Sequence, residues 1–192
     1  MIRQMSRQMI SPRIAALAAL ACVALPAVAA DAPLPAVRLA KAMAAAADAE
    51  KMGDKLALAK AVRIIDASGS HALDASEHDP LPAWRSGAAG SGTPPYRGRP
   101  LGPGYRSGKL DPGGHESFSQ LFLSGTGATI ALSAPTGDRL GLRVLDPQAK
   151  PICEDGTGRG GMCRWVPLFT QRYTIEVMNI GKGDARYFLV VQ

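Results

Sequence analysis

The sequence predicts a mainly β protein, in which a C-terminal antiparallel β-sandwich (jelly-roll-like) follows a short α-helical hairpin and a Pro/Gly-rich linker. Three observations predict this arrangement. Short apolar runs that alternate with polar residues, and that end in turn residues, fill the chain from 116 to 192. Apolar residues recur at helical spacing between 34 and 67. Prolines and glycines interrupt the chain from 68 to 107.

The first 30 residues have the pattern of a secretory signal peptide. Arg3, Arg7 and Arg13 make a basic start, and residues 14–25 form an apolar run that is too short to span a membrane. Small residues lead up to Ala30, and we expect cleavage after Ala30 or one residue earlier. The mature protein is therefore expected to be periplasmic or secreted, without a membrane-spanning segment.

Two alternatives would keep a membrane attachment. An uncleaved leader would act as an anchor, and lipid attachment at Cys22 would make a lipoprotein. The short apolar core and its small-residue exit argue against the anchor. Ala19 argues against the lipoprotein, because a large aliphatic residue usually stands three positions before the modified cysteine.

Removal of the leader changes the charge and the cysteine count. The chain has 22 Lys and Arg against 16 Asp and Glu, a formal net charge of +6. Loss of the three leader arginines leaves 19 basic residues and a net charge of +3, which argues against nucleic acid as a partner. Cys22 leaves as well, and an even pair of cysteines in an exported chain favours a disulfide.

Residues 31–67 are predicted to form a helical hairpin. Leu39 and Met43 recur at helical spacing in an alanine-rich stretch, Gly53 suits the position after a helix end, and Asp54 suits the cap of the next helix. The second helix has an apolar face of Leu58, Val62 and Ile65. Two such helices bury too little surface to be stable alone. We expect them to pack on the sandwich, to pair with another chain or to stay partly mobile.

Residues 68–107 are predicted to form a flexible linker, because prolines, glycines and serines leave few residues for regular elements. Aromatic residues alternate with arginines along it. The candidate surface-binding residues of this segment are Tyr96, Arg97, Arg99, Tyr105 and Arg106. They would stack on bases or sugars, or lie on an anionic surface. We favour the alternative of a solvated tether whose aromatic residues dock on a neighbouring fold, because no basic domain accompanies the segment.

Residues 108–192 are predicted to form the β-sandwich domain. Apolar residues at alternate positions, or in short runs, mark the expected strands: Phe118, Leu121 and Leu123; 129–133; 140–144; 152–154; 163–165; Tyr173, Ile175 and Val177; Tyr187, Leu189 and Val191. Glycines, prolines and Asp or Asn supply the turns between them. Several short strands at this interval indicate a sandwich or barrel rather than a parallel α/β sheet.

Several motifs in this region resemble the bacterial pre-peptidase C-terminal domain. They are Gly104-Tyr105-Arg106, Leu140-x-Leu142-x-Val144-x-Asp146, Trp165-x-Pro167 and Tyr173-Thr174-Ile175-x-Val177-x-Asn179-x-Gly181. The resemblance covers about residues 104–192 and implies a β-sandwich module of secreted and periplasmic proteins, often appended to proteases. The acidic doublets with which some members hold calcium are reduced here to isolated acids. No peptidase domain precedes the module, so a role in protease maturation in cis is not expected.

Cys153 and Cys163 are predicted to form the disulfide. Closure of a loop of about 11 residues stabilises a fold by roughly 2.5–3 kcal/mol. A metal site is disfavoured because no histidine follows Lys150, and a redox pair is disfavoured because the cysteines form no C-x-x-C. The loop between them matches G-x-G-x-x-G over 156–161, but an extended segment follows where a dinucleotide site requires a helix. We expect a flexible turn there.

Acidic residues at predicted strand ends are the candidate metal ligands. They are Asp138, Asp146, Glu154 and Asp155. Ca²⁺ takes at least six oxygen ligands, so these loops would have to converge to bind it. The alternative is that each side chain bonds its local backbone. No other cofactor is expected.

Three aromatic residues are predicted to belong to the core: Trp165, Tyr173 and Tyr187. A sugar-stacking platform is the alternative for Trp165 and Tyr173, but a Trp two residues after a disulfide cysteine more often packs in the core.

The sequence predicts a protein that is not an enzyme. His71, His78 and His115 belong to no metal-binding or catalytic motif, and no G-x-S-x-G occurs. We therefore expect an exported, non-catalytic envelope protein whose sandwich binds a protein or glycan, or acts as a scaffold. The alternative is an accessory or inhibitor of a secreted hydrolase, such as a protease, that acts in trans.

Overall fold

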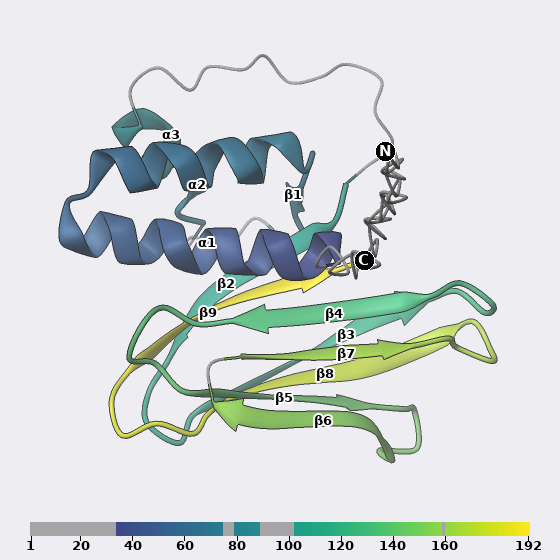
Figure 1. The fold of residues 1–192 in the computed structure, drawn as a ribbon. Coiled ribbons are helices and arrows are strands. Elements are labelled where there is room, and N and C mark those ends of the chain that lie inside the picture. The colour runs from purple at the N-terminus through teal and green to yellow at the C-terminus, as the bar shows by residue number, and fades with distance from the viewer. Residues whose placement is uncertain (1–33, 75–78, 89–101, 159) are drawn as a thin grey trace, which may run out of the picture. The chain divides into compact units, whose positions relative to one another are not determined.

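Two β-sheets pack face to face, and helices cover the outer face of one of them (Figure 1). The computed structural model describes residues 34–74, 79–88, 102–158 and 160–192. The prediction of a mainly β fold, with a sandwich preceded by helices, is confirmed. The predicted signal peptide lies outside the described residues.

The chain crosses between the two sheets several times. The helix-covered sheet has the strand order β1 (His71–Ala72), β2 (Gly104–Leu110), β9 (Ala185–Val191), β4 (Ala128–Ser133) and β7 (Gly160–Trp165). The open sheet has the order β3 (His115–Phe122), β8 (Gln171–Asn179), β5 (Leu140–Leu145) and β6 (Pro151–Gly158). β1 pairs with β2 in parallel, and the other described pairs are antiparallel.

The helical hairpin forms as its capping residues predict. Helix α1 (Pro35–Met52) has a proline in its first turn and ends at Gly53, whose φ of +68° suits a residue without Cβ. Helix α2 (Lys55–Ala67) begins at Asp54, whose carboxylate accepts hydrogen bonds from the N–H groups of Leu56 and Ala57 at 3.1 and 2.9 Å.

The hairpin packs on the sandwich. α1 lies between α2 and the helix-covered sheet, where it contacts β4 and β9 (Figure 1). Its small buried side chains allow this close approach on both sides: Ala36, Ala40, Ala42, Ala44, Ala46, Ala47 and Ala49. Polar contacts support the docking, because Asp48 accepts a 2.9 Å hydrogen bond from the Thr136 N–H and Glu50 lies 3.3 Å from Arg186. Of the three expected outcomes for the hairpin, the structure shows packing on the sandwich.

Strand β9 contributes to two cores. Tyr187, Leu189 and Val191 face the sandwich interior with the predicted inward residues of β5 and β8, all of which are buried. Phe188 and Val190 face the helices. A strand with buried residues on both faces is typical of a sheet that is covered on both sides.

The predicted flexible linker is wrong where the structure describes it. β1, the short helix α3 (Leu81–Gly87) and the first residues of β2 all lie within 68–107. Asp79 accepts a 3.0 Å hydrogen bond from the Leu81 N–H, and proline is well tolerated in the first turn of a helix. Trp84 of α3 is buried against Phe188, with ring centroids 5.7 Å apart. Residues 75–78 and 89–101 lie outside the described part.

The flexible turn predicted at 156–161 is too long. β6 continues to Gly158 and β7 starts at Gly160, so most of these residues belong to strands, and residue 159 lies outside the described part. A Cβ at Gly160 would overlap the Leu132 carbonyl oxygen, so glycine lets β7 lie close to β4. A Cβ at Gly161 would lie 2.8 Å from Cβ of Asp155, whereas a Cβ at Gly156 would meet no described neighbour within 4 Å.

Candidate functional site

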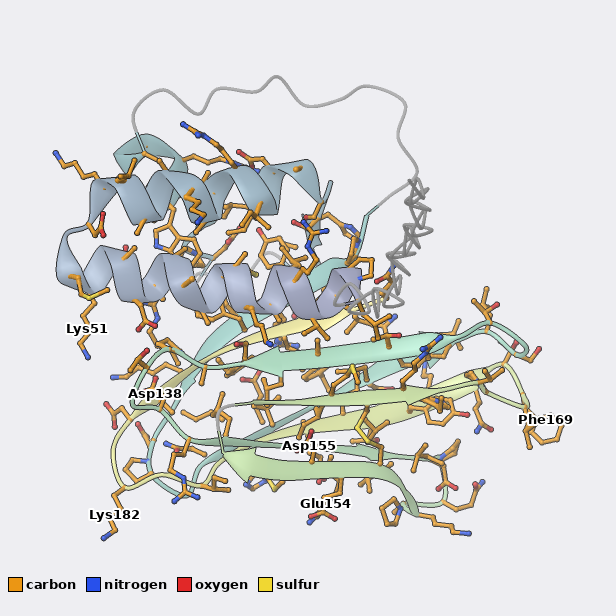
Figure 2. All side chains as sticks on the ribbon, viewed as in Figure 1. Lys51, Asp138, Glu154, Asp155, Phe169 and Lys182 are labelled. Carbon is orange, nitrogen blue, oxygen red and sulfur yellow. A yellow bond between two sulfur atoms is a disulfide. The ribbon has the colours of Figure 1, made fainter. Side chains whose placement is uncertain are left out.

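Four exposed apolar side chains gather on two loops at one end of the sandwich. Leu123 follows β3, and Val166, Leu168 and Phe169 lie between β7 and β8. Their side chains are 59%, 59%, 83% and 70% exposed. Figure 2 shows Phe169 pointing away from the sandwich at this end. We call these four residues the apolar tip.

Hydrogen bonds hold the two loops of the apolar tip together. The Gly125 N–H donates to the Pro167 carbonyl at 2.9 Å, and the Ser124 N–H donates to the Thr170 hydroxyl oxygen at 3.0 Å. These bonds satisfy backbone N–H and C=O groups of both loops. The two loops are therefore joined, and their apolar side chains form one surface.

An aromatic cluster packs at the base of the loops that carry the apolar tip. The ring of Phe122 lies 4.9 Å from that of Trp165 and 5.8 Å from that of Tyr173, and the Trp165 and Tyr173 rings are 5.3 Å apart. Tyr173 is buried, while Trp165 is partly buried and packs against the sandwich core. These contacts fix the strand ends from which the loops emerge.

A groove of about 400 Å³ runs beside the apolar tip. Leu121 and Leu123 lie at its exposed side, and Phe122, Ala128 and Val191 are buried lining residues. In β3 the residues at even positions face inward, so Leu121 is left on the outer surface. The groove and the apolar tip therefore form one continuous surface that is mainly apolar.

The candidate metal ligands are separated. Asp138 and Asp146 flank opposite ends of β5, and Figure 2 shows Glu154 and Asp155 away from Asp138. Asp138 accepts from the Arg186 N–H at 2.8 Å, Asp146 accepts from the Lys150 N–H at 2.8 Å, and Asp155 accepts from the Met162 N–H at 3.1 Å. Glu154 forms an ion pair of 3.0 Å with Arg143.

None of these acids joins a group of three or more metal-ligating side chains within the described residues. Asp146 follows the alternative in which a turn acid bonds its local backbone. Asp138 and Asp155 instead accept from backbone N–H groups of other segments, and Glu154 bonds an arginine side chain. Calcium binding stays a prediction.

Tyr105 is not a surface residue. It is 3% exposed in the core between sheet and helices, and its hydroxyl donates to Asp79 at 2.9 Å. Burial, followed by this hydrogen bond, raises the pKa of Tyr105 above its usual value. The burial of Trp84 and Tyr105 agrees with the favoured interpretation, in which aromatic residues of the segment dock on the fold. Tyr96, Arg97 and Arg99 lie outside the described residues.

Arg106 bridges the two sheets. Its guanidinium lies 2.9 Å from Asp74 and 2.9 Å from Glu116, and it stacks on the ring of Phe118 at 5.0 Å. Glu116 also accepts a 2.6 Å hydrogen bond from the hydroxyl of Tyr187, which is fully buried. Burial and then this bond raise the pKa of Tyr187. This network has a structural role, so Arg106 is not free to bind a ligand.

Cys153 and Cys163 form the predicted disulfide, with Cα atoms 5.8 Å apart. The bond joins β6 of the open sheet to β7 of the helix-covered sheet, and both are edge strands. It therefore closes one side of the sandwich. An intramolecular disulfide is compatible with a location outside the cytoplasm.

The apolar tip was missed as a candidate site by the sequence analysis. Leu168-Phe169 follows Pro167 between two predicted strands, and an apolar pair in a predicted loop is a usable signal. In the described part of the chain, no helix has the length and apolar character needed to cross a bilayer.

Comparisons with known proteins support no more than the fold. No family model matches, and no curated protein matches. Similar solved structures include a periplasmic inhibitor of g-type lysozyme from Aeromonas hydrophila (16% identity, TM-score 0.36) and the pre-peptidase C-terminal domain of a Bacillus anthracis collagenase (18% identity, TM-score 0.37). A third is a mitogen from Yersinia pseudotuberculosis (10% identity, TM-score 0.39).

Each of these similarities covers 46% of this chain, and 82%, 87% and 82% of the respective neighbours. The second neighbour belongs to the family that residues 104–192 resemble, but the similarity is one of fold, and membership of that family is not shown. At these identities and TM-scores the neighbours carry no argument about function.

Proposed function

We propose that this chain is an exported, non-catalytic binding module of the bacterial cell envelope, in which a helix-braced β-sandwich attaches to its partner through the apolar tip. The observation that carries the proposal is the gathering of four exposed apolar side chains on two loops joined by hydrogen bonds. Single exposed apolar residues are normal on protein surfaces, whereas clusters of them mark contact surfaces.

The scaffold suits a binding role. Loops that carry function are usually positioned by rigid elements, and here the aromatic cluster beneath the loops and the disulfide across the sandwich edge provide that support. Full burial of a Leu or Phe side chain against a partner contributes about 1.5–3 kcal/mol. Leu168 and Phe169 together can therefore supply much of the affinity of a moderate complex.

The chemistry of the apolar tip favours an apolar partner surface over a glycan. The neighbours of Phe169 at the tip are aliphatic. The Thr170 hydroxyl close by accepts from the Ser124 N–H and donates to the Ser124 hydroxyl, so both hydroxyls are engaged. Trp165 and Tyr173 are packed on each other and on Phe122, so they offer no open stacking platform. No contact among the described residues singles out a hydrolase, so the accessory or inhibitor hypothesis stays untested.

The test is co-sedimentation of the exported chain, purified after export, with envelope preparations from the producing bacterium. The variant Leu168→Ser/Phe169→Ser removes the most exposed part of the apolar tip. Met52→Ser/Leu56→Ser is the matched control. These residues are 71% and 82% exposed where α1 is connected to α2, away from the apolar tip. We expect the tip variant to lose binding and the control variant to bind as the wild type does.

Two results would overturn the proposal. One is equal sedimentation of the wild type and the tip variant. The other is turnover of peptides, esters or glycosides that survives repurification and that a point substitution abolishes, since this would make the chain an enzyme.

A further inference from the structure

We propose that the surface to which the apolar tip attaches is an anionic phospholipid membrane, with the tip inserted among the lipids and nearby arginines on the lipid phosphates. This inference rests on the proposed function and names its partner. Three features carry it: the apolar tip, the arginines beside it and the contacts that engage the described acids nearby.

Two exposed arginines flank the apolar tip. Arg164 lies in β7, two residues before Val166, and pairs across the sheet with Thr129. Arg172 lies in β8, three residues after Phe169, and pairs with Leu121 of β3. Neither forms an ion pair with a described residue. Both charges are therefore available to an anion that approaches this end.

A second pair of arginines lies at the same end. Arg38 and Arg63 line a cleft of about 540 Å³ between α1 and α2. This cleft and the groove beside the apolar tip share three lining residues: Gly102, Pro103 and Gln192. Arg38 and Arg63 also lack an ion pair within the described chain. The basic side chains thus extend from the loops to the ends of the helices.

Two acids near this end, among the residues that the structure describes, already have partners. Asp146, in the turn after β5, accepts hydrogen bonds from the N–H groups of Gln148 and Lys150 at 2.9 and 2.8 Å. Asp66, in the last turn of α2, lies 2.6 Å from Arg85. The opposite end has mixed charge, with Lys109 paired to Asp184 at 2.6 Å. Figure 2 shows Lys51, Asp138 and Lys182 on that side, away from Phe169.

An apolar tip with a basic surround fits the interface of an anionic bilayer. Apolar side chains enter the boundary between headgroups and acyl chains, and each Lys or Arg close to an anionic surface adds about fivefold to the affinity. A protein partner of matching chemistry would need an apolar surface surrounded by carboxylates. The membrane is the simpler occupant, because every anionic bilayer has both features.

The test is sedimentation with protein-free vesicles of phosphatidylcholine alone or of phosphatidylcholine with phosphatidylglycerol, at low and at raised salt. The wild-type chain should bind the phosphatidylglycerol vesicles, bind the neutral vesicles far more weakly, and lose affinity as salt screens the charges. Leu168→Ser/Phe169→Ser should weaken binding about tenfold or more. Arg164→Gln/Arg172→Gln should weaken it about thirtyfold at low salt.

Matched variants at the opposite end serve as controls. Met52→Ser/Leu56→Ser and Lys51→Gln/Lys182→Gln change the same kinds of side chain and should bind as the wild type does. Circular dichroism and thermal unfolding of each variant show that it is folded before its binding is compared.

The possible failures are distinguishable. If the wild type sediments with bacterial envelopes through its apolar tip but ignores protein-free vesicles, an envelope protein is the partner: the lipid inference fails and the proposed function stands. If it binds neither, both fail. Binding to phosphatidylglycerol vesicles that all four double variants retain would also overturn the inference, because it would show non-specific adsorption of a basic protein.

Discussion

Phe188→Ala tests whether the helices and the sandwich form one cooperative unit. Phe188 is fully buried on the face of β9 that the helices cover, where its ring lies 5.7 Å from that of Trp84. Truncation of a buried Phe costs about 3–5 kcal/mol, because transfer free energy is lost and a cavity is left. If the helices did not cover this sheet, Phe188 would face solvent and its truncation would change stability by about 0.5 kcal/mol or less.

The assay is urea unfolding followed by circular dichroism and by tryptophan fluorescence. We expect Phe188→Ala to lower the unfolding free energy by about 3 kcal/mol or more, with the two signals still changing together. Leu189→Ala is the matched control, because Leu189 is the next residue of β9 and is buried in the sandwich core. A large loss for Leu189→Ala, together with a negligible loss for Phe188→Ala, would refute helix docking.

Three further predictions follow from the fold. Replacement of Cys153 and Cys163 by Ser should lower the unfolding free energy by about 2.7 kcal/mol, the loop-closure entropy for a sequence separation of 10. A loss below about 1 kcal/mol in urea unfolding would contradict this entropic explanation. Gly108→Ala should destabilise by about 1–3 kcal/mol in the same assay, because a Cβ there would lie 2.7 Å from Cζ of Tyr187; an unchanged midpoint would refute that packing. Burial and hydrogen bonds to Asp79 and Glu116 raise the pKa values of Tyr105 and Tyr187 in the folded chain. The stability that the two hydroxyl groups contribute to the fold should therefore be full below about pH 10, the usual pKa of tyrosine, and should fall as the pH rises above it. Tyr105→Phe/Tyr187→Phe should flatten the alkaline fall of the urea midpoint, and parallel curves for variant and wild type would contradict this.

Local patterns predicted the regular elements well. The alternation of Leu140, Leu142 and Val144 reflects a strand with one face in the core, and all three side chains are fully buried. Gly53 and Asp54 marked the boundary between α1 and α2 because capping depends on neighbouring residues only. Such signals can be read without knowledge of the tertiary fold.

Elements that depend on distant contacts were predicted poorly. α3 begins among prolines that resemble a linker, and burial of Leu81 and Trp84 against other elements distinguishes it. Tyr105 looks like an exposed aromatic residue beside an arginine until the helices cover it. Gly160 reads as part of a turn because its close approach to β4 cannot be seen from the sequence alone.

The candidate site also depends partly on local sequence patterns and partly on distant contacts. Leu121 and Leu123 were expected among the apolar strand residues, but β3 ends at Phe122 and both side chains are exposed. Leu168-Phe169 is visible as an apolar pair in a loop. What no local pattern provides is the meeting of the two loops. Ser124 and Thr170 are 46 residues apart in sequence and join through a hydrogen bond of 3.0 Å.

The central claim is that the apolar tip is the part of the molecule that enters its partner. Its most direct test is an environment-sensitive fluorophore attached at Phe169→Cys, compared with the same fluorophore at Leu56→Cys, while bacterial envelopes are added. We predict a blue-shifted, brighter emission at position 169 and no change at position 56. An unchanged spectrum at position 169, or equal changes at both positions, would contradict the account.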